Sequence, residues 1–110
     1  MQFSASALAL LGAFAVAQAN EVFFGCSRTM VSSYNTTNPY MSYGLCAETC
    51  RTGKGSCGKP TAMALSDQVC HCGKLPDQND LVDEALCNTP CPGYGMDTCG
   101  GPNTFTVFSI

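Results

Sequence analysis

The sequence predicts a single small α+β domain that is stabilised by disulfide bonds. Three observations lead to this fold class: a length of 110 residues, a total of nine cysteines, and short alternating apolar segments around one helical pattern. Eleven glycines and six prolines indicate that turns and loops separate these segments. A domain of this size buries too little apolar surface to be comfortably stable on its core alone. Each disulfide would add roughly 2–4 kcal/mol, so we expect the cross-links to be part of the basic stability of the fold.

Residues 1–19 are typical of a secretory signal peptide. Their apolar stretch, residues 7–17, is shorter than the roughly 18 residues that a membrane span requires, and a small-x-small cleavage pattern follows at residues 17–19. The segment has no Lys or Arg, and a buried N-terminal helix is the alternative interpretation. The cysteine content favours the signal peptide because disulfides form in oxidising compartments. We therefore expect residues 20–110 to be the mature domain, secreted to the extracellular space or cell wall, without a membrane span.

The first half of the mature chain is predicted to contain a strand, a polar loop and the main helix. Residues 22–24 are large and apolar, which predicts a strand. Residues 32–40 are mostly polar and predict a loop. Residues 41–52 predict the helix, because Ser42 can cap its start and Gly53 follows its end.

The second half is predicted to contain a strand pair, a short helix and a terminal strand. Residues 62–65 and 69–72 are expected to be strands on either side of a short turn. Residues 104–110 alternate polar and apolar side chains, as a strand does. A short helix is expected at 80–86, capped by Asp80, with three side chains turned inward: Leu81, Val82 and Ala85. A loop is expected between this helix and the terminal strand.

The charge balance and the single histidine exclude several kinds of partner and site. Five Lys and Arg stand against eight Asp and Glu, so neither nucleic acid nor anionic lipid is an expected partner. One acidic run could suggest a glycosidase pair or a Ca²⁺ loop, but it fits a negatively charged first helical turn better: Asp77, Asp80, Asp83 and Glu84. His71 lies between two cysteines, which disfavours a catalytic role. We expect no catalytic residue, no metal and no cofactor.

The cysteine spacing predicts a link between the helix and a strand. Cys46 and Cys50 are four residues apart and share one side of the predicted helix. Cys70 and Cys72 are two residues apart and share one face of a strand. We favour disulfides between these two pairs, although the sequence does not set the partners. A zinc site around residues 70–72 is the competing interpretation, and the oxidising compartment disfavours it.

The most specific pattern is the order of four short motifs before an apolar terminal strand: Cys46-x3-Cys50, Val69-Cys70-His71-Cys72-Gly73, Cys87-Asn88-Thr89-Pro90-Cys91 and Cys99-Gly100-Gly101-Pro102-Asn103. Over most of residues 23–108 this order resembles the WSC domain of fungal cell-wall stress sensors. The resemblance implies an antiparallel sheet curved around one main helix, as in apple-type domains. It also implies four disulfides among eight cysteines: Cys26, Cys46, Cys50, Cys70, Cys72, Cys87, Cys91 and Cys99. Cys57 falls outside the pattern and is the candidate for a free thiol or for a disulfide-linked homodimer.

The resemblance further implies non-catalytic binding of cell-wall polysaccharide, such as β-glucan or chitin. The sensors continue into a Ser/Thr-rich stalk, a transmembrane helix and a cytoplasmic tail. This sequence lacks all three, so signalling across a membrane is not expected. The alternative is a secreted protein-interaction module, acting as an effector or adhesion protein at the cell surface. An enzyme is disfavoured because no nucleophile stands out.

Sugar binding needs aromatic faces for stacking and polar groups that fix orientation. The candidates are three tyrosines and one asparagine: Tyr34, Tyr40, Tyr94 and Asn103. Tyr43, on the predicted helix, is a weaker candidate. The alternative interpretation is that the tyrosines cover a small core and that Asn103 forms a turn. Asn35 begins the sequon Asn-Thr-Thr and is the candidate glycosylation site.

Overall fold

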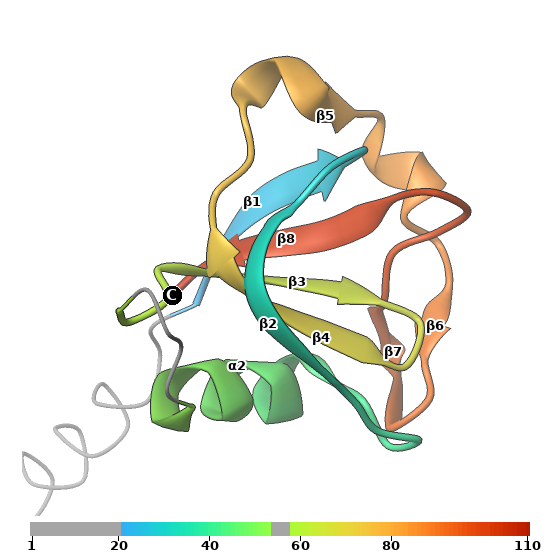
Figure 1. Cartoon of the computed structure of the whole chain (residues 1–110). Coiled ribbons are helices and arrows are strands. Elements are labelled where there is room, and N and C mark those ends of the chain that lie inside the picture. Colours follow the sequence, from blue (N-terminus) through green and yellow to red (C-terminus); the bar gives the residue numbers. More distant parts are fainter. Residues whose placement is uncertain (1–20, 54–57) are drawn as a thin grey trace, which may run out of the picture.

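The computed structural model describes residues 21–53 and 58–110, which form one curved antiparallel sheet, one α-helix and a separate hairpin. The predicted signal peptide and Cys57 lie outside these residues. The six-stranded sheet has the order β2-β4-β3-β8-β1-β5, and all its pairs are antiparallel. Figure 1 shows α2 against the concave side of the curved sheet and the β6–β7 hairpin at one end. The predicted fold class is confirmed.

The helix α2 spans Tyr43–Thr52, so it ends where the sequence predicts and has the predicted cap at Ser42, but it begins two residues after the predicted start at residue 41. The hydroxyl of Ser42 accepts a hydrogen bond from the Leu45 amide at 3.2 Å, which satisfies one of the amides left unpaired at a helix start. At the other end, the Gly53 amide donates to the Thr49 carbonyl at 2.9 Å. The buried face of α2 consists of Cys46, Ala47 and Cys50.

The centre of the sheet is formed by β3 (Ala62–Ser66), β4 (Val69–Lys74) and β8 (Phe105–Ser109). Four consecutive residues of β3, 62–65, are fully buried, which shows that both faces of this strand are covered. The turn between β3 and β4 places Asp67 at a φ of 53°, a conformation that Asp tolerates better than most residues. The predicted strand pair and terminal strand are therefore present.

The predicted loop at residues 32–40 is wrong, because most of it is the edge strand β2 (Val31–Thr37). Tyr34 and Thr36 lie opposite Cys72 and Cys70 of β4. The strand is polar because nearly all of its side chains are exposed, so the usual alternation of apolar and polar residues is missing.

The predicted helix at 80–86 is also wrong. Its place is taken by two 3₁₀ turns, η1 (Gln78–Asp80) and η2 (Glu84–Leu86), on either side of the short strand β5 (Leu81–Val82). Each turn has its own cap: the Asp77 carboxylate accepts from the Asn79 amide at 2.9 Å, and the Asp83 carboxylate accepts from the Ala85 amide at 3.0 Å. The cap at Asp80 is therefore absent, and Ala85 is exposed rather than turned inward. Pairing of β5 with β1 (Val22–Ser27) interrupts the helical pattern.

The expected loop before the terminal strand contains a further hairpin, formed by β6 (Pro90–Cys91) and β7 (Tyr94–Thr98). Strand β6 has only two residues, too few for any periodic pattern. The hairpin is closed by a disulfide between Cys91 and Cys99.

Three further disulfides cross-link the domain. Cys26 of β1 is bonded to Cys87, which directly follows η2. Two disulfides, Cys46–Cys70 and Cys50–Cys72, join α2 to β4. The cysteines of these two links pack with the main apolar cluster, which includes Met41, Met63, Leu65 and Phe108. Among residues 21–53 and 58–110, the four disulfides are all within one chain. Cys57 is outside these residues, so a link between two chains through it stays a prediction.

Within residues 21–53 and 58–110, no helix is both long enough and apolar enough to cross a membrane.

Candidate functional site

Two of the four predicted sugar-binding residues, Tyr40 and Tyr94, lie at one junction on the surface. Tyr40 precedes α2 and is 73% exposed, and Tyr94 begins β7 and is 56% exposed. Met96 lies two residues further along β7, on the same face as Tyr94, and is 81% exposed. We call these three side chains the tyrosine patch.

The junction depends on close contact between two backbone segments. The Gly93 amide donates to the carbonyl of Met41 at 2.8 Å. A Cβ atom at Gly93 would overlap the Tyr40 carbonyl oxygen, so only glycine fits at this position. The side chain of Met41 is buried in the core, which anchors the segment that carries Tyr40. The backbone next to Tyr40 and Tyr94 is therefore fixed by the hydrogen bond between Gly93 and Met41 and by the buried side chain of Met41.

Tyr43 fixes the hairpin against the helix instead of facing solvent. Its hydroxyl accepts from the Thr98 amide at 2.8 Å and lies 2.7 Å from the Thr98 hydroxyl oxygen. Its own amide donates to the Asp97 carboxylate at 3.0 Å. Its ring packs edge-on against Phe108 at 4.7 Å between centroids. This network sets the position of β7, and with it the position of Tyr94.

Replacing Tyr43 with Phe is expected to lower the free energy of unfolding by about 1–3 kcal/mol, because the Thr98 amide loses its partner. Tyr40→Phe is the matched control and should leave stability within about 0.5 kcal/mol, since Tyr40 is exposed. Urea unfolding of both variants measures the difference. Equal stability of Tyr43→Phe and Tyr40→Phe would show that the buried network contributes nothing.

Tyr34 is separated from the tyrosine patch by the length of α2. It is partly buried on β2, and its hydroxyl lies 3.5 Å from the carbonyl of Cys50, near the end of the helix. Tyr40 precedes the start of the same helix, which has ten residues and is therefore about 15 Å long. The structure thus places Tyr34 against the core, as the alternative interpretation expected.

The two asparagines that the sequence singled out lie elsewhere. Asn103 occupies the turn before β8 with a φ of 58°, a left-handed conformation that Asn adopts more readily than most residues. Asn35 is exposed on β2, directly opposite His71 of β4. The sequon is therefore in an edge strand rather than in an open loop, and its asparagine faces solvent.

His71 is half-buried on the convex side of the sheet, away from the four sulfur atoms of the links between α2 and β4. Its ring packs edge-on against Phe105 at 5.2 Å between centroids. Its cross-strand neighbours are Asn35 and Ala64, which carry no charge. Burial lowers the pKa of His71 below the ordinary value of about 6.5.

This shift makes stability depend on pH. The unfolded chain takes up the proton first as pH falls below about 6.5. The contribution of neutral His71 to the free energy of unfolding is therefore complete above that pH, and it is lost as pH falls toward the lower pKa of His71 in the folded state. We expect His71→Phe to lose less stability than the parent between pH 7 and pH 5, as measured by urea unfolding. If the free energy of unfolding changes equally with pH in the parent and in His71→Phe, the lowered pKa of His71 is contradicted.

The acidic run has structural roles. Asp77 and Asp83 cap the two 3₁₀ turns. The Asp80 carboxylate accepts from the Thr29 hydroxyl at 2.9 Å and lies 3.8 Å from Arg28. These contacts join η1 to the end of β1.

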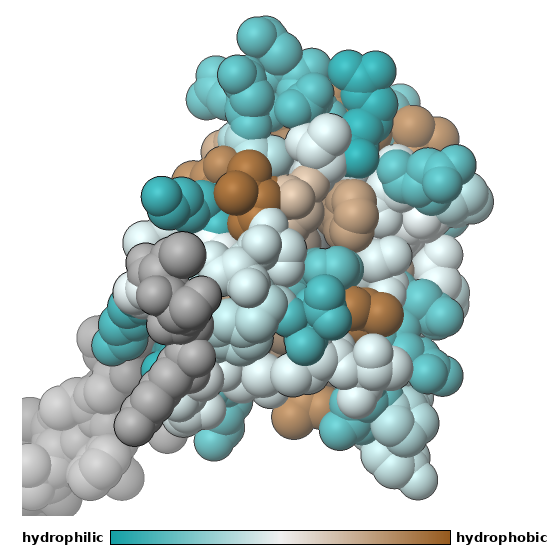
Figure 2. Space-filling view, viewed as in Figure 1, coloured by the Kyte–Doolittle hydropathy of each residue, from teal (hydrophilic) through white to brown (hydrophobic). Residues whose placement is uncertain are grey.

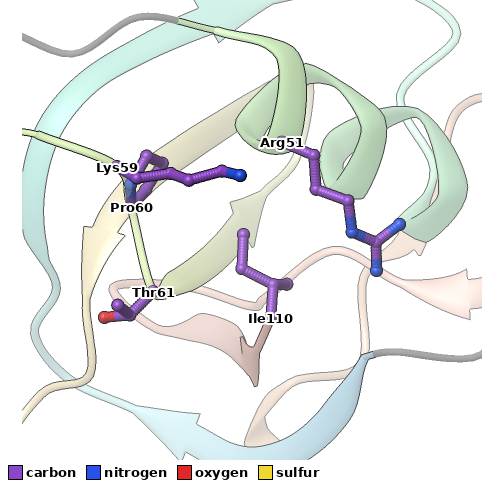
Figure 3. Close-up of a pocket in the computed structure, with 5 residues that line it drawn as sticks. All are labelled: Arg51, Lys59, Pro60, Thr61 and Ile110. Carbon is purple, nitrogen blue, oxygen red and sulfur yellow. The ribbon is translucent and has the colours of Figure 1, made fainter.

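The sequence did not indicate an open cavity of about 560 Å³ beside the end of α2. It is lined by five residues from three parts of the chain: Arg51, Lys59, Pro60, Thr61 and Ile110. Figure 3 shows Lys59 extending toward α2 across the cavity. Arg51 is paired with Glu21 at 2.8 Å, so its charge is partly neutralised.

Hydrophobic side chains are scattered over the face of the molecule that carries β2. Figure 2 shows hydrophobic side chains in separate small groups among hydrophilic ones on the face that carries β2. Met96 was missed by sequence reasoning. The alternation of Tyr94, Met96 and Thr98 is the signal that could have revealed its strand and its exposed face.

In the part of the chain that the structure describes, one α-helix is linked to a curved antiparallel sheet by two disulfides, and a third disulfide closes a hairpin that carries the exposed Tyr94. These features define a small cysteine-rich module. The WSC domain model matches residues 23–101, and the chain belongs to this family.

Three relatives support the assignment. The chain is 28% identical over 106 residues to Protein SLG1 of Saccharomyces cerevisiae, covering 94% of this chain and 26% of that protein. It is 39% identical over 46 residues to cell wall integrity and stress response component 1 of Schizosaccharomyces pombe, covering 42% and 12%. It is 30% identical over 94 residues to an uncharacterized protein in the LEU2 3′ region of Pichia angusta, covering 82% and 23%. The chain spans about a quarter or less of each relative.

Proposed function

We propose that this WSC domain binds cell-wall polysaccharide without cleaving it, and that Tyr40 and Tyr94 are the principal contacts. The observation that carries the proposal is the junction at Gly93, where two exposed tyrosines from distant parts of the sequence stand on touching, anchored backbone. Rigid aromatic faces bind the apolar faces of sugar rings with little loss of side-chain entropy. The name of the S. pombe relative, a cell wall integrity and stress response component, agrees with a ligand in the wall.

The expected affinity is low for a single sugar chain. Trp, the largest aromatic side chain, is absent. A surface patch of two tyrosines also lacks the enclosure of a deep pocket. Binding to an insoluble polymer would gain from many neighbouring sites rather than from one tight site. Asn103 and Tyr34 are secondary candidates that stand apart from the patch.

Co-sedimentation of the disulfide-bonded protein with insoluble β-glucan and with chitin tests the proposal. We expect retention on at least one polymer and no release of soluble sugar. Tyr40→Ala and Tyr94→Ala should each weaken retention about tenfold, the effect of losing one aromatic contact of about 1.4 kcal/mol. Leu86→Ala is the matched control, because Leu86 is an exposed apolar residue on η2.

If the protein is retained on neither β-glucan nor chitin, the proposed function is overturned. Retention that survives both tyrosine substitutions would overturn the site and leave the function standing. Asn103→Ala and Tyr34→Ala, measured in the same assay, then identify whether a secondary candidate carries the binding. Release of soluble sugar would contradict the non-catalytic assignment.

Met96 favours a second candidate, contact with another protein at the cell surface. Its flexible thioether side chain is common at adaptable protein interfaces and offers a sugar little directional hydrogen bonding. If the domain binds a protein partner, that binding should persist in excess soluble glucan or chitin oligosaccharide. If the oligosaccharide displaces the bound material, polysaccharide is the favoured ligand.

A further inference from the structure

The curved sheet ends in two edge strands of very different length. At one edge, β5 has only two residues and lies between Asp80 and Asp83. At the other edge, β2 has seven residues and, within the described part of the chain, pairs on one side only, with β4. An edge strand can pair with the edge of a second molecule, and short length, charge, proline and bulges are the features that prevent this. The β5 edge is both short and flanked by charge.

Strand β2 has few of these protective features. It contains no charged residue and no proline. A register shift between Ser32 and Tyr34 disturbs its first half, but residues 34–37 pair without interruption with residues 69–72 of β4. Tyr and Thr occupy three of these four positions, and both residue types favour strands. Residues 34–37 are therefore suited to pair, along their outer edge, with the same strand of another copy of the chain.

The sequon Asn-Thr-Thr lies inside this regular run. Asn35 and Thr37, the two residues that an N-glycosylation sequon requires, are both exposed. The disulfides of the domain are typical of proteins that fold in an oxidising, secretory compartment, where sequons are modified. We propose that Asn35 carries an N-linked glycan, and that this glycan prevents β2 from pairing with β2 of a second copy of the chain.

The modification requires an oligosaccharide that is joined to a lipid through a diphosphate. The side-chain nitrogen of Asn35 forms a bond to the anomeric carbon of the first sugar. The bond from that carbon to the diphosphate oxygen breaks, the lipid diphosphate leaves with the electron pair, and one amide proton is released. The product places a bulky, hydrated group on the middle of the regular run. A second chain then cannot approach to the spacing of about 4.8 Å that strand pairing needs.

The test begins with the glycan itself, on the chain secreted from a eukaryotic host. Asn35→Gln removes the acceptor amide, and Thr37→Val removes the sequon hydroxyl while keeping a residue that favours strands. Thr37→Ser is the matched control, because it keeps the hydroxyl. By mass spectrometry, before and after an endoglycosidase specific for N-linked sugars, we expect a glycan on the parent and on Thr37→Ser and none on the other two variants.

Sedimentation of the four proteins at rising concentration then measures pairing. The parent and Thr37→Ser should stay monomeric. Asn35→Gln and Thr37→Val should form dimers or larger assemblies, in which hydrogen exchange slows at the amides of residues 34–37. A link through Cys57 survives a denaturing gel without reductant, whereas strand pairing does not. In Asn35→Gln, the additional change Thr36→Lys puts a charge on the edge and should restore the monomer.

Three outcomes would each overturn the proposal. One is a parent without an N-linked glycan, and another is a monomer for both Asn35→Gln and Thr37→Val at every concentration. The third is association that persists in Asn35→Gln/Thr36→Lys, which would place the contact outside β2. Because the sequon is lost in two independent ways, failure of one variant to be secreted leaves the other to decide. Retention on polysaccharide enters none of these measurements, so the result is independent of the tyrosine patch.

Discussion

Removing the Cys26–Cys87 disulfide is expected to lower the free energy of unfolding by about 4 kcal/mol. This bond joins residues 61 positions apart, the longest separation of the four disulfides, so it restricts the unfolded chain most. It also holds β1, next to the edge of the sheet, to the segment after η2. The variant Cys26→Ala/Cys87→Ala, studied by urea unfolding of the oxidised protein, measures the loss.

The matched control is the shortest link. Cys91 and Cys99 are only eight positions apart, and Cys91→Ala/Cys99→Ala should cost about 2.5 kcal/mol. The expected order, with the longer link contributing more, follows from chain entropy in the unfolded state. A reversed order would show that packing around each bond in the folded state, rather than loop length, governs the contribution of each disulfide.

Gly93→Ala is expected to have the second largest effect, because it acts on stability and binding together. The new methyl group would overlap the Tyr40 carbonyl, and backbone cannot move aside as a flexible side chain can. We expect a loss of about 1–3 kcal/mol, the usual cost of forcing extra volume into a packed site. The two tyrosines should also separate, which lowers retention on wall polysaccharide.

Gly95 provides a control from the same hairpin. A Cβ atom there would meet nothing within 4 Å, so Gly95→Ala should leave stability and binding close to those of the parent. Urea unfolding and co-sedimentation of the two variants test the junction. If Gly93→Ala behaves like Gly95→Ala, the contact between the two segments is not what positions the tyrosines.

The elements that could be predicted from the sequence are those with strong local signals. Helix α2 has a polar cap at Ser42 and a glycine after its end, and the hairpin of β3 and β4 has apolar strands around a turn. The spacing of Cys46, Cys50, Cys70 and Cys72 indicated the link between helix and sheet, because helical and strand periodicity each turn two thiols to one side.

The segments that were predicted wrongly take their structure from distant partners. Strand β2 is polar throughout and becomes a strand only by pairing with β4. Residues 81–82 are extended because they pair with Cys26 and Ser27, more than 50 positions away. The contact of Gly93 with Met41 is equally non-local, so the sequence indicated Tyr40 and Tyr94 separately but not their junction.

The most direct test of sugar binding at the tyrosine patch is NMR titration of the isotope-labelled, disulfide-bonded protein with soluble β-glucan oligosaccharide and, in parallel, with chitin oligosaccharide. We predict that one of them shifts the ring resonances of Tyr40 and Tyr94 and the backbone amide of Gly93, while Tyr34 is unaffected. Shifts confined to Tyr34 or to Asn103 would contradict the proposed site, and no shift with either sugar would contradict sugar binding itself.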